Sequence, residues 1–166
     1  MTALYWTIGL VALQRLIELF HSSRNTARLR RLGAVEADAG AYPLYVLLHA
    51  GWLVSLAVFV PATTPPNWLL ICLFALLQLG RIWVLASLGR YWTTRIITLP
   101  SAPLVRTGPF RYLRHPNYLL VAAEIAVLPL AFGAVAVAVT FSALNLMLLA
   151  RRIRIEERVL APRRAA

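Results

Sequence analysis

The sequence predicts an all-α protein, a multi-pass bundle of about five membrane-spanning helices. Its 166 residues are 60% hydrophobic and only 14% charged, and the mean hydropathy is +0.71. Soluble domains carry more charge, about a quarter of their residues. Five apolar segments also approach the roughly 20 residues that a helix needs to cross a bilayer. We therefore expect residues 1–166 to form a single integral membrane domain.

The five predicted spans follow one another along the chain. Their approximate bounds are 4–20, 42–60, 68–87, 118–132 and 134–150. The last two form one apolar run that is too long for a single crossing, so we predict a helical hairpin that turns near Gly133. The first span has no basic segment before it and no A-x-A site after it, so we expect a retained helix and not a cleaved signal peptide.

The placement of arginine predicts the orientation in the membrane. Arginines gather at 24–31, 90–114 and 151–164, whereas the connections at 61–66 and near Gly133 carry no charge. Because cytoplasmic loops collect arginine, we expect the N-terminus outside and the C-terminus in the cytoplasm of a bacterial cell. Arginines beside a membrane also contact anionic lipids. Nucleic acid is not an expected partner, since no motif for it is present.

Two residue types limit the chemistry. All 17 basic residues are arginine, which excludes a Walker A loop and a pyridoxal Schiff base because both need lysine. The single cysteine, Cys72, excludes CxxC motifs and cysteine zinc sites. His21 and His49 are too far apart for a metal motif, and we interpret both as structural. No metal is expected.

The segment from residue 88 to 117 is the longest polar stretch and is predicted to be ordered and cytoplasmic. It contains five arginines and four aromatic residues, with Tyr118 directly after it, and Pro100, Pro103 and Pro109 restrict its backbone. A disordered linker would lack those aromatics. Long ordered loops tend to be functional, so the candidate site lies here.

Within this segment, the run Arg114-His-Pro-Asn-Tyr118 predicts the start of the fourth helix. Proline pushes His115 out of the α region and is itself well placed as the first helical residue. The free N–H groups and the positive end of the helix dipole then form a site for a carboxylate or phosphate. In the alternative interpretation, His115 only caps the helix and Tyr118 only anchors it at the membrane interface.

A second group of charged residues, Arg152-Ile-Arg-Ile-Glu-Glu-Arg158, directly follows the last span, on a predicted C-terminal helix at 151–160. Its carboxylates are spaced to pair with arginines one turn away on an ordinary solvated face. Paired carboxylates beside an anion site also suit a ligand that carries both charges and vicinal hydroxyls, as a nucleoside amino acid does.

The run from Gly108 to Tyr118, followed by a helical hairpin and then Arg152-Ile-x-x-Glu-Glu157, resembles the isoprenylcysteine carboxyl methyltransferase family of integral membrane enzymes. The motifs of this resemblance cover roughly residues 85–160. The first half resembles a bacterial subgroup through Gln14–Leu19, Ser23–Asn25, Gly33–Glu36 and Tyr42–Leu44. That subgroup includes enzymes that O-methylate alkylpyrones made by type III polyketide synthases.

The resemblance implies S-adenosylmethionine as the methyl donor. Carried over residue by residue, it implies that the cofactor is contacted by Arg114, His115, Pro116, Tyr118, Glu156 and Glu157. The lack of any G-x-G run agrees, since a soluble Rossmann-type enzyme would need a glycine-rich turn.

The expected reaction is O-methylation of a lipophilic carboxylate or acidic hydroxyl that reaches the membrane interface from the bilayer. Arg81 and Arg95 are candidates for steering this substrate, since a charge in or near a span is costly and usually faces a cavity. Glu124 is a further charge within a span, and we expect it to pair with Arg81.

Three alternatives stay open at this point. A phospholipid N-methyltransferase would share the motifs and methylate an amine. A membrane sterol-type reductase also carries an Arg-His-Pro-Asn-Tyr segment and uses NADPH, but it lacks the Glu-Glu ending. A membrane scaffold without enzymatic activity would have little use for so ordered a loop.

Overall fold

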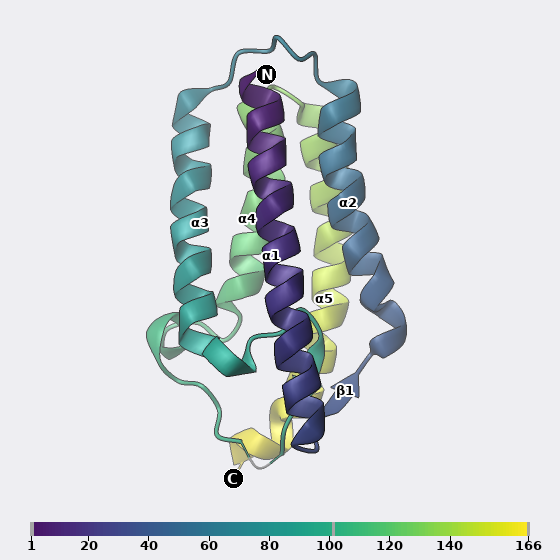
Figure 1. The fold of residues 1–166 in the computed structure, drawn as a ribbon, viewed down its shortest axis with the longest axis vertical. Helices are drawn as coiled ribbons and strands as arrows, with labels where there is room; N and C mark the ends of the chain where they lie inside the picture. The colour runs from purple at the N-terminus through teal and green to yellow at the C-terminus, as the bar shows by residue number, and fades with distance from the viewer. Residues whose placement is uncertain (1, 101, 166) are drawn as a thin grey trace.

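The protein is a bundle of α-helices, described by a computed structural model over residues 2–100 and 102–165. Residues 1, 101 and 166 of the predicted domain lie outside the described residues. In chain order, the α-helices of the described part are α1 (Ala3–Arg31), α2 (Tyr42–Phe59), α3 (Trp68–Leu88), α4 (Pro116–Ala131) and α5 (Val135–Ala165). They run along a common long axis, with the two chain ends at opposite ends of the bundle (Figure 1). The all-α, multi-pass prediction is confirmed.

A helix lies at each of the five predicted spans, but two helices are much longer than expected. Helix α1 continues to Arg31 and α5 to Ala165, so their arginine-rich ends are helical extensions of the spans and not separate loop or helix segments. Within the described residues, four helices are long and apolar enough to cross a membrane, whereas α4 has only 16 residues. Large apolar side chains cover the outer faces, as lipid contact requires, for example Leu10, Phe20, Leu47, Val58, Leu69 and Leu76.

The end of the bundle that holds the N-terminus is packed by apolar side chains. Its core joins residues of all five helices, including Leu4, Trp52, Phe74, Leu128 and Val137. Helix α4 packs between α3 and α5, and α4 and α5 form the predicted hairpin, with Gly133 in the left-handed region at φ +68°. The Asn67 side chain caps α3 by accepting from Leu69 N at 3.1 Å and Leu70 N at 3.3 Å.

Halfway along the bundle, the four charges inside the predicted spans meet in one neutral quartet. Arg81 donates from Nε to Glu18 Oε1 and from Nη2 to Glu18 Oε2, each at 2.5 Å. Its third nitrogen, Nη1, lies 3.4 Å from Glu124 Oε2. Arg15 bonds both Glu18 and Glu124. The predicted Arg81–Glu124 pair is confirmed. The quartet ties α1, α3 and α4 together, because an unpaired charge is costly in a bilayer.

The opposite end of the bundle carries short elements that the sequence did not predict. Strands β1 (Val35–Ala37) and β2 (Ile96–Thr98) pair antiparallel, with Glu36 opposite Ile97. The 3₁₀ helices are η1 (Ala39–Ala41), η2 (Gly89–Tyr91) and η3 (Gly108–Arg111). The strand pair joins the connection after α1 to the connection after α3, so the predicted ordered segment 88–117 is fixed to the first half of the chain.

Candidate active site

A cavity of about 570 Å³ lies at this end of the bundle, within the 300–1,000 Å³ that ligand pockets usually have. Its walls come from the segment between η2 and α4, from the first turn of α4 and from the last turns of α5. One part of the wall is apolar and includes Leu29, Leu88, Leu104, Val105, Phe110 and Leu160. The predicted ordered segment therefore forms most of a cavity.

The first turn of α4 forms one polar wall. The helix begins at Pro116, as predicted, and His115 is its N-cap, outside the α region at φ −132° and ψ 56°. The His115 carbonyl accepts from Tyr118 N at 3.1 Å. His115, Pro116, Asn117 and Tyr118 all line the cavity, so the positive end of the α4 dipole lies at its wall.

The carboxylates of α5 face this helix start. Glu157 Oε1 lies 2.6 Å from His115 Nε2, and Glu156 Oε1 lies 3.7 Å from His115 Nδ1. The Tyr118 hydroxyl donates to Glu156 Oε2, and the rings of His115 and Tyr118 stack at 5.4 Å. Glu156 lines the cavity, whereas Glu157 contacts His115 without belonging to the cavity wall. The two motifs, about forty residues apart in sequence, thus meet in one site.

The surroundings of His115 favour its protonated form. The Glu156 carboxylate and the hydrogen bond to Glu157 raise the pKa of His115 above its ordinary value near 6.5, and partial burial opposes them only in part. Protonated His115 donates from its Nε2–H to Glu157. A charge-assisted bond of this kind holds the start of α4 against the end of α5.

Arg152 connects this site to the rest of the protein. Its Nε donates to the Tyr118 hydroxyl at 2.9 Å and its Nη2 donates to the Thr94 carbonyl at 2.8 Å. The guanidinium also lies over the rings of Tyr45 and Tyr118, 5.0 and 5.5 Å from their centroids. The sequence pattern allowed Arg152 to pair with Glu156 one turn along α5, but the guanidinium instead crosses to Tyr118 and Thr94.

The predicted steering arginines lie in different places. Arg95 lines the cavity, packs over the Tyr42 ring at 3.8 Å and lies 2.6 Å from Glu36 Oε1. Burial alone would raise the pKa of Glu36, but its bonds to Arg95 and Arg30 hold that pKa below its ordinary range. Arg81 is 5% exposed, belongs to the quartet, and is absent from the described lining of the cavity.

Several residues of the site were not singled out from the sequence. Asn117 and Trp92 line the cavity, and Arg163 near the end of α5 donates to the carbonyl of Ala102 at 2.5 Å. Thr94 lies behind the wall and accepts from Arg152. Asn117 is part of the quoted Arg-His-Pro-Asn-Tyr run, so that motif was the available signal. Nothing in the sequence pattern indicated Thr94, because its partners come from distant helices.

Comparison with known proteins identifies the family. The model of the isoprenylcysteine carboxyl methyltransferase (ICMT) family matches residues 68–162. The chain belongs to this family. The matched range holds α3, the cavity segment, α4 and nearly all of α5, including every residue of the Arg-His-Pro-Asn-Tyr and Glu-Glu motifs. An ICMT-family chain is a membrane methyltransferase, and the enzymes of this family generally use S-adenosylmethionine.

Two relatives extend the comparison. The chain is 34% identical over 162 residues to an uncharacterized protein, YpbQ, of Bacillus subtilis (strain 168), covering 95% of this chain and 96% of YpbQ. It is 37% identical over 90 residues to an uncharacterized protein of Haemophilus influenzae (strain ATCC 51907 / DSM 11121 / KW20 / Rd), covering 54% of this chain and 51% of that protein. No solved structure matches the chain.

Proposed function

We propose that this ICMT-family protein transfers the methyl group of S-adenosylmethionine to a carboxylate or acidic hydroxyl of a lipophilic molecule. The observation that carries the proposal is the meeting of the α4 N-terminus with Glu156 in one cavity wall. This wall presents both a positive helix end and a carboxylate, which match the carboxylate and ammonium groups of the methionyl part.

The donor groups present fit the cofactor. Among the described side chains, Asn117 Oδ1 is buried at the cavity wall without a hydrogen-bond partner. Buried polar atoms are seldom left unpaired in proteins, so this amide oxygen at a cavity wall fits a donor group of a bound ligand. Tyr118 and Trp92 add aromatic faces, which attract a cation such as a sulfonium.

Each part of the wall has a separate task in the proposed mechanism. S-adenosylmethionine, when bound, supplies a methyl group that is already activated on sulfur. The Asn117 N–H and the positive end of the α4 dipole would hold the carboxylate of the cofactor, and Glu156 would hold its ammonium group or ribose hydroxyls. His115 orients the helix start through Glu157. Pro116 begins the helix, and Arg114 adds positive charge at the cavity rim. Alignment of the nucleophile, the methyl group and the sulfur is then sufficient, because an ionised oxygen nucleophile needs no general base.

The charge of the cavity favours an anionic methyl acceptor. The described wall holds one carboxylate, Glu156, and six arginines: Arg95, Arg106, Arg111, Arg114, Arg152 and Arg163. Such a wall attracts a carboxylate or enolate and repels a protonated amine. This favours O-methylation over phospholipid N-methylation. Arg95 is the steering residue we propose, because it lines the cavity next to the apolar wall; Arg81 is engaged in the quartet.

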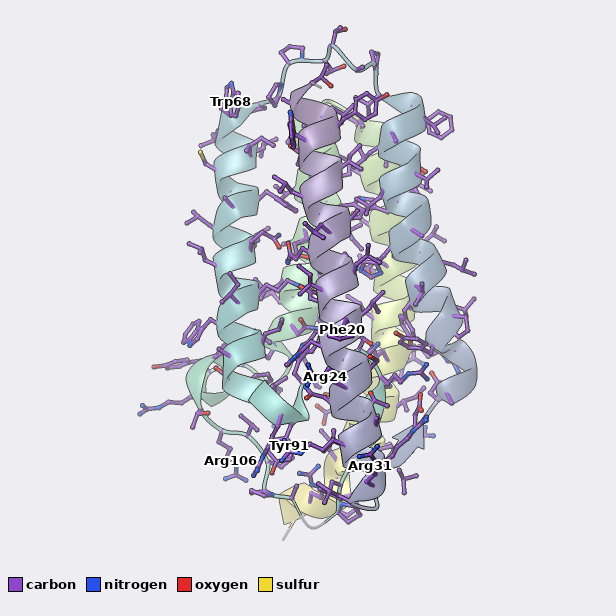
Figure 2. The ribbon with its side chains drawn as sticks, viewed as in Figure 1. Phe20, Arg24, Arg31, Trp68, Tyr91 and Arg106 are labelled. Carbon is purple, nitrogen blue, oxygen red and sulfur yellow. The ribbon has the colours of Figure 1, made fainter. Side chains whose placement is uncertain are left out.

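We also propose that the cavity faces the cytoplasm and that the apolar tail of the substrate stays in the bilayer, among membrane lipids. Figure 2 supports this orientation, since Arg24, Arg31 and Arg106 lie at the cavity end and Trp68 lies at the other. The uncharged connection between α2 and α3 lies at the Trp68 end (Figure 1), and the Asn67 N–H donates to the Ala131 carbonyl at 2.7 Å, so the uncharged turn between α4 and α5 lies at the same end. The positive-inside rule then assigns the N-terminus to the outer side. An alkylpyrone is one acceptor with this chemistry.

Cofactor binding tests the proposal before any acceptor is known. Isothermal titration of the detergent-purified chain with S-adenosylhomocysteine is expected to give binding, which Glu156→Gln weakens about 10- to 100-fold, since one charged hydrogen bond is lost. Arg154→Gln, on the exposed face of the same turn, is the matched control and should bind like the wild type. Binding of NADPH alone would refute the proposal in favour of a reductase.

A further inference from the structure

Thr94 connects the N-terminal half of the chain to the candidate site by hydrogen bonds to both. The Thr94 carbonyl accepts from Arg152 Nη2 at 2.8 Å, and Arg152 Nε donates to the Tyr118 hydroxyl at 2.9 Å. The Tyr118 hydroxyl in turn donates to Glu156. Hydrogen bonds therefore connect Thr94 continuously to the carboxylate in the cavity wall.

Thr94 is held on its other side by α1 and α2. Its backbone N–H donates to Ser22 Oγ at 2.8 Å, and its hydroxyl lies 2.8 Å from Ser22 Oγ and 3.0 Å from the Tyr42 hydroxyl. Ser22 is 2% exposed. The N–H and the hydroxyl of Thr94 thus fix the position of this residue, while its carbonyl faces Arg152.

Asn25, one turn after Ser22 on α1, fixes the backbone just before Thr94. Its Nδ2 donates to the carbonyls of Gly89 at 3.1 Å and Trp92 at 2.8 Å. Buried side-chain bonds of this kind hold a connection that has no regular secondary structure of its own. The segment from 89 to 94 is therefore positioned by α1.

We propose that Thr94 is a positioning residue for the cofactor site. Held by Ser22 and Tyr42, its carbonyl fixes the Arg152 guanidinium, which fixes the Tyr118 hydroxyl and so the Glu156 carboxylate. Neither Ser22 nor Thr94 belongs to the described lining of the cavity, so both act through Arg152. A long arginine side chain has many rotamers, and anchoring it in advance lowers the entropic cost of binding.

This inference rests on the proposed cofactor site, and its test uses the same titration with S-adenosylhomocysteine. Ser22→Ala and Thr94→Val are each expected to weaken binding about three- to tenfold, the effect of one lost buried hydrogen bond. Thr94→Ser keeps the hydroxyl and should bind like the wild type. Ser23→Ala is the matched control on α1, because Ser23 is exposed and its hydroxyl donates to the Phe20 carbonyl of its own helix.

A double-mutant cycle separates positioning from a general loss of stability. If Ser22 acts through Tyr118, then Ser22→Ala should have no further effect on affinity in a Tyr118→Phe background. Independent effects in the cycle, or equal affinities of Ser22→Ala and Ser23→Ala, would overturn the inference. Where Ser22→Ala does not fold, the comparison of Thr94→Val with Thr94→Ser decides. Absence of binding by the wild type would instead refute the proposed function, and this inference with it.

Discussion

The charged quartet inside the bundle gives the sharpest stability prediction. Glu124 is 0% exposed and contacts both Arg15 and Arg81. Glu124→Gln keeps the shape of the side chain but leaves two arginines against the single carboxylate of Glu18. Removing one partner of a buried ion pair costs about 3–5 kcal/mol, since the remaining charge is left uncompensated. For a chain of this size, that loss lowers the Tm by roughly 6–20 °C.

Thermal unfolding of the detergent-purified variants measures this effect. Restoring neutrality with Arg15→Gln in the Glu124→Gln background should recover at least half of the lost Tm, since no unpaired charge then remains. Glu36→Gln is the control, because the arginine partners of Glu36 are partly exposed and such pairs contribute about 1 kcal/mol or less. An unchanged Tm in Glu124→Gln, or no recovery in the double variant, would refute the assignment of the quartet as a unit.

Two further predictions concern the backbone and the pH. Gly108 has φ +58°, and a Cβ there would lie 2.1 Å from Ser87 Oγ, so Gly108→Ala should lower stability by about 1–3 kcal/mol in thermal unfolding. Gly9→Ala, in helix α1 with nothing within 4 Å, should raise it by about 0.5–1 kcal/mol; equal effects of the two would contradict the close approach at Gly108. The pKa of His115 is raised in the folded state. Its bond to Glu157 therefore contributes fully to the free energy of unfolding below pH about 6.5, and this contribution is lost as the pH rises through the folded pKa. The Tm of His115→Gln should therefore be less sensitive to pH over this range than that of the wild type, and parallel profiles would show that His115 is not responsible.

The helices were predictable from the sequence because lipid contact imposes long apolar segments. The start of α4 was predictable as well, since Pro116 limits the backbone before it. The length of α1 was not, because its arginine-rich continuation resembles a loop in composition while the helix persists to Arg31. Strands β1 and β2 have three residues each, too few to give a period in the sequence.

The candidate site was predictable to the extent that its motifs are local. His115, Tyr118 and Glu156 were indicated by their motifs, and the fold brings them together. Arg81 was a candidate for the site because a charge in a span usually faces a cavity. The quartet gives that charge a different explanation, since Glu18 on α1 supplies the partner. Arg152 belongs to a quoted motif, but its bonds to Tyr118 and Thr94 join distant segments, and such contacts leave no local pattern.

Transfer of a methyl group into lipid is the reaction that we propose for this protein, and it can be measured directly. Bacterial membranes that contain the wild-type chain or Glu156→Gln are incubated with S-adenosylmethionine labelled on its methyl group, and label is counted in the lipid extract before and after mild base. We expect lipid-soluble label that depends on Glu156, and release of methanol by base would identify a methyl ester. Cofactor binding without any label in lipid, or label confined to amine headgroups, would contradict O-methylation of a lipophilic acceptor.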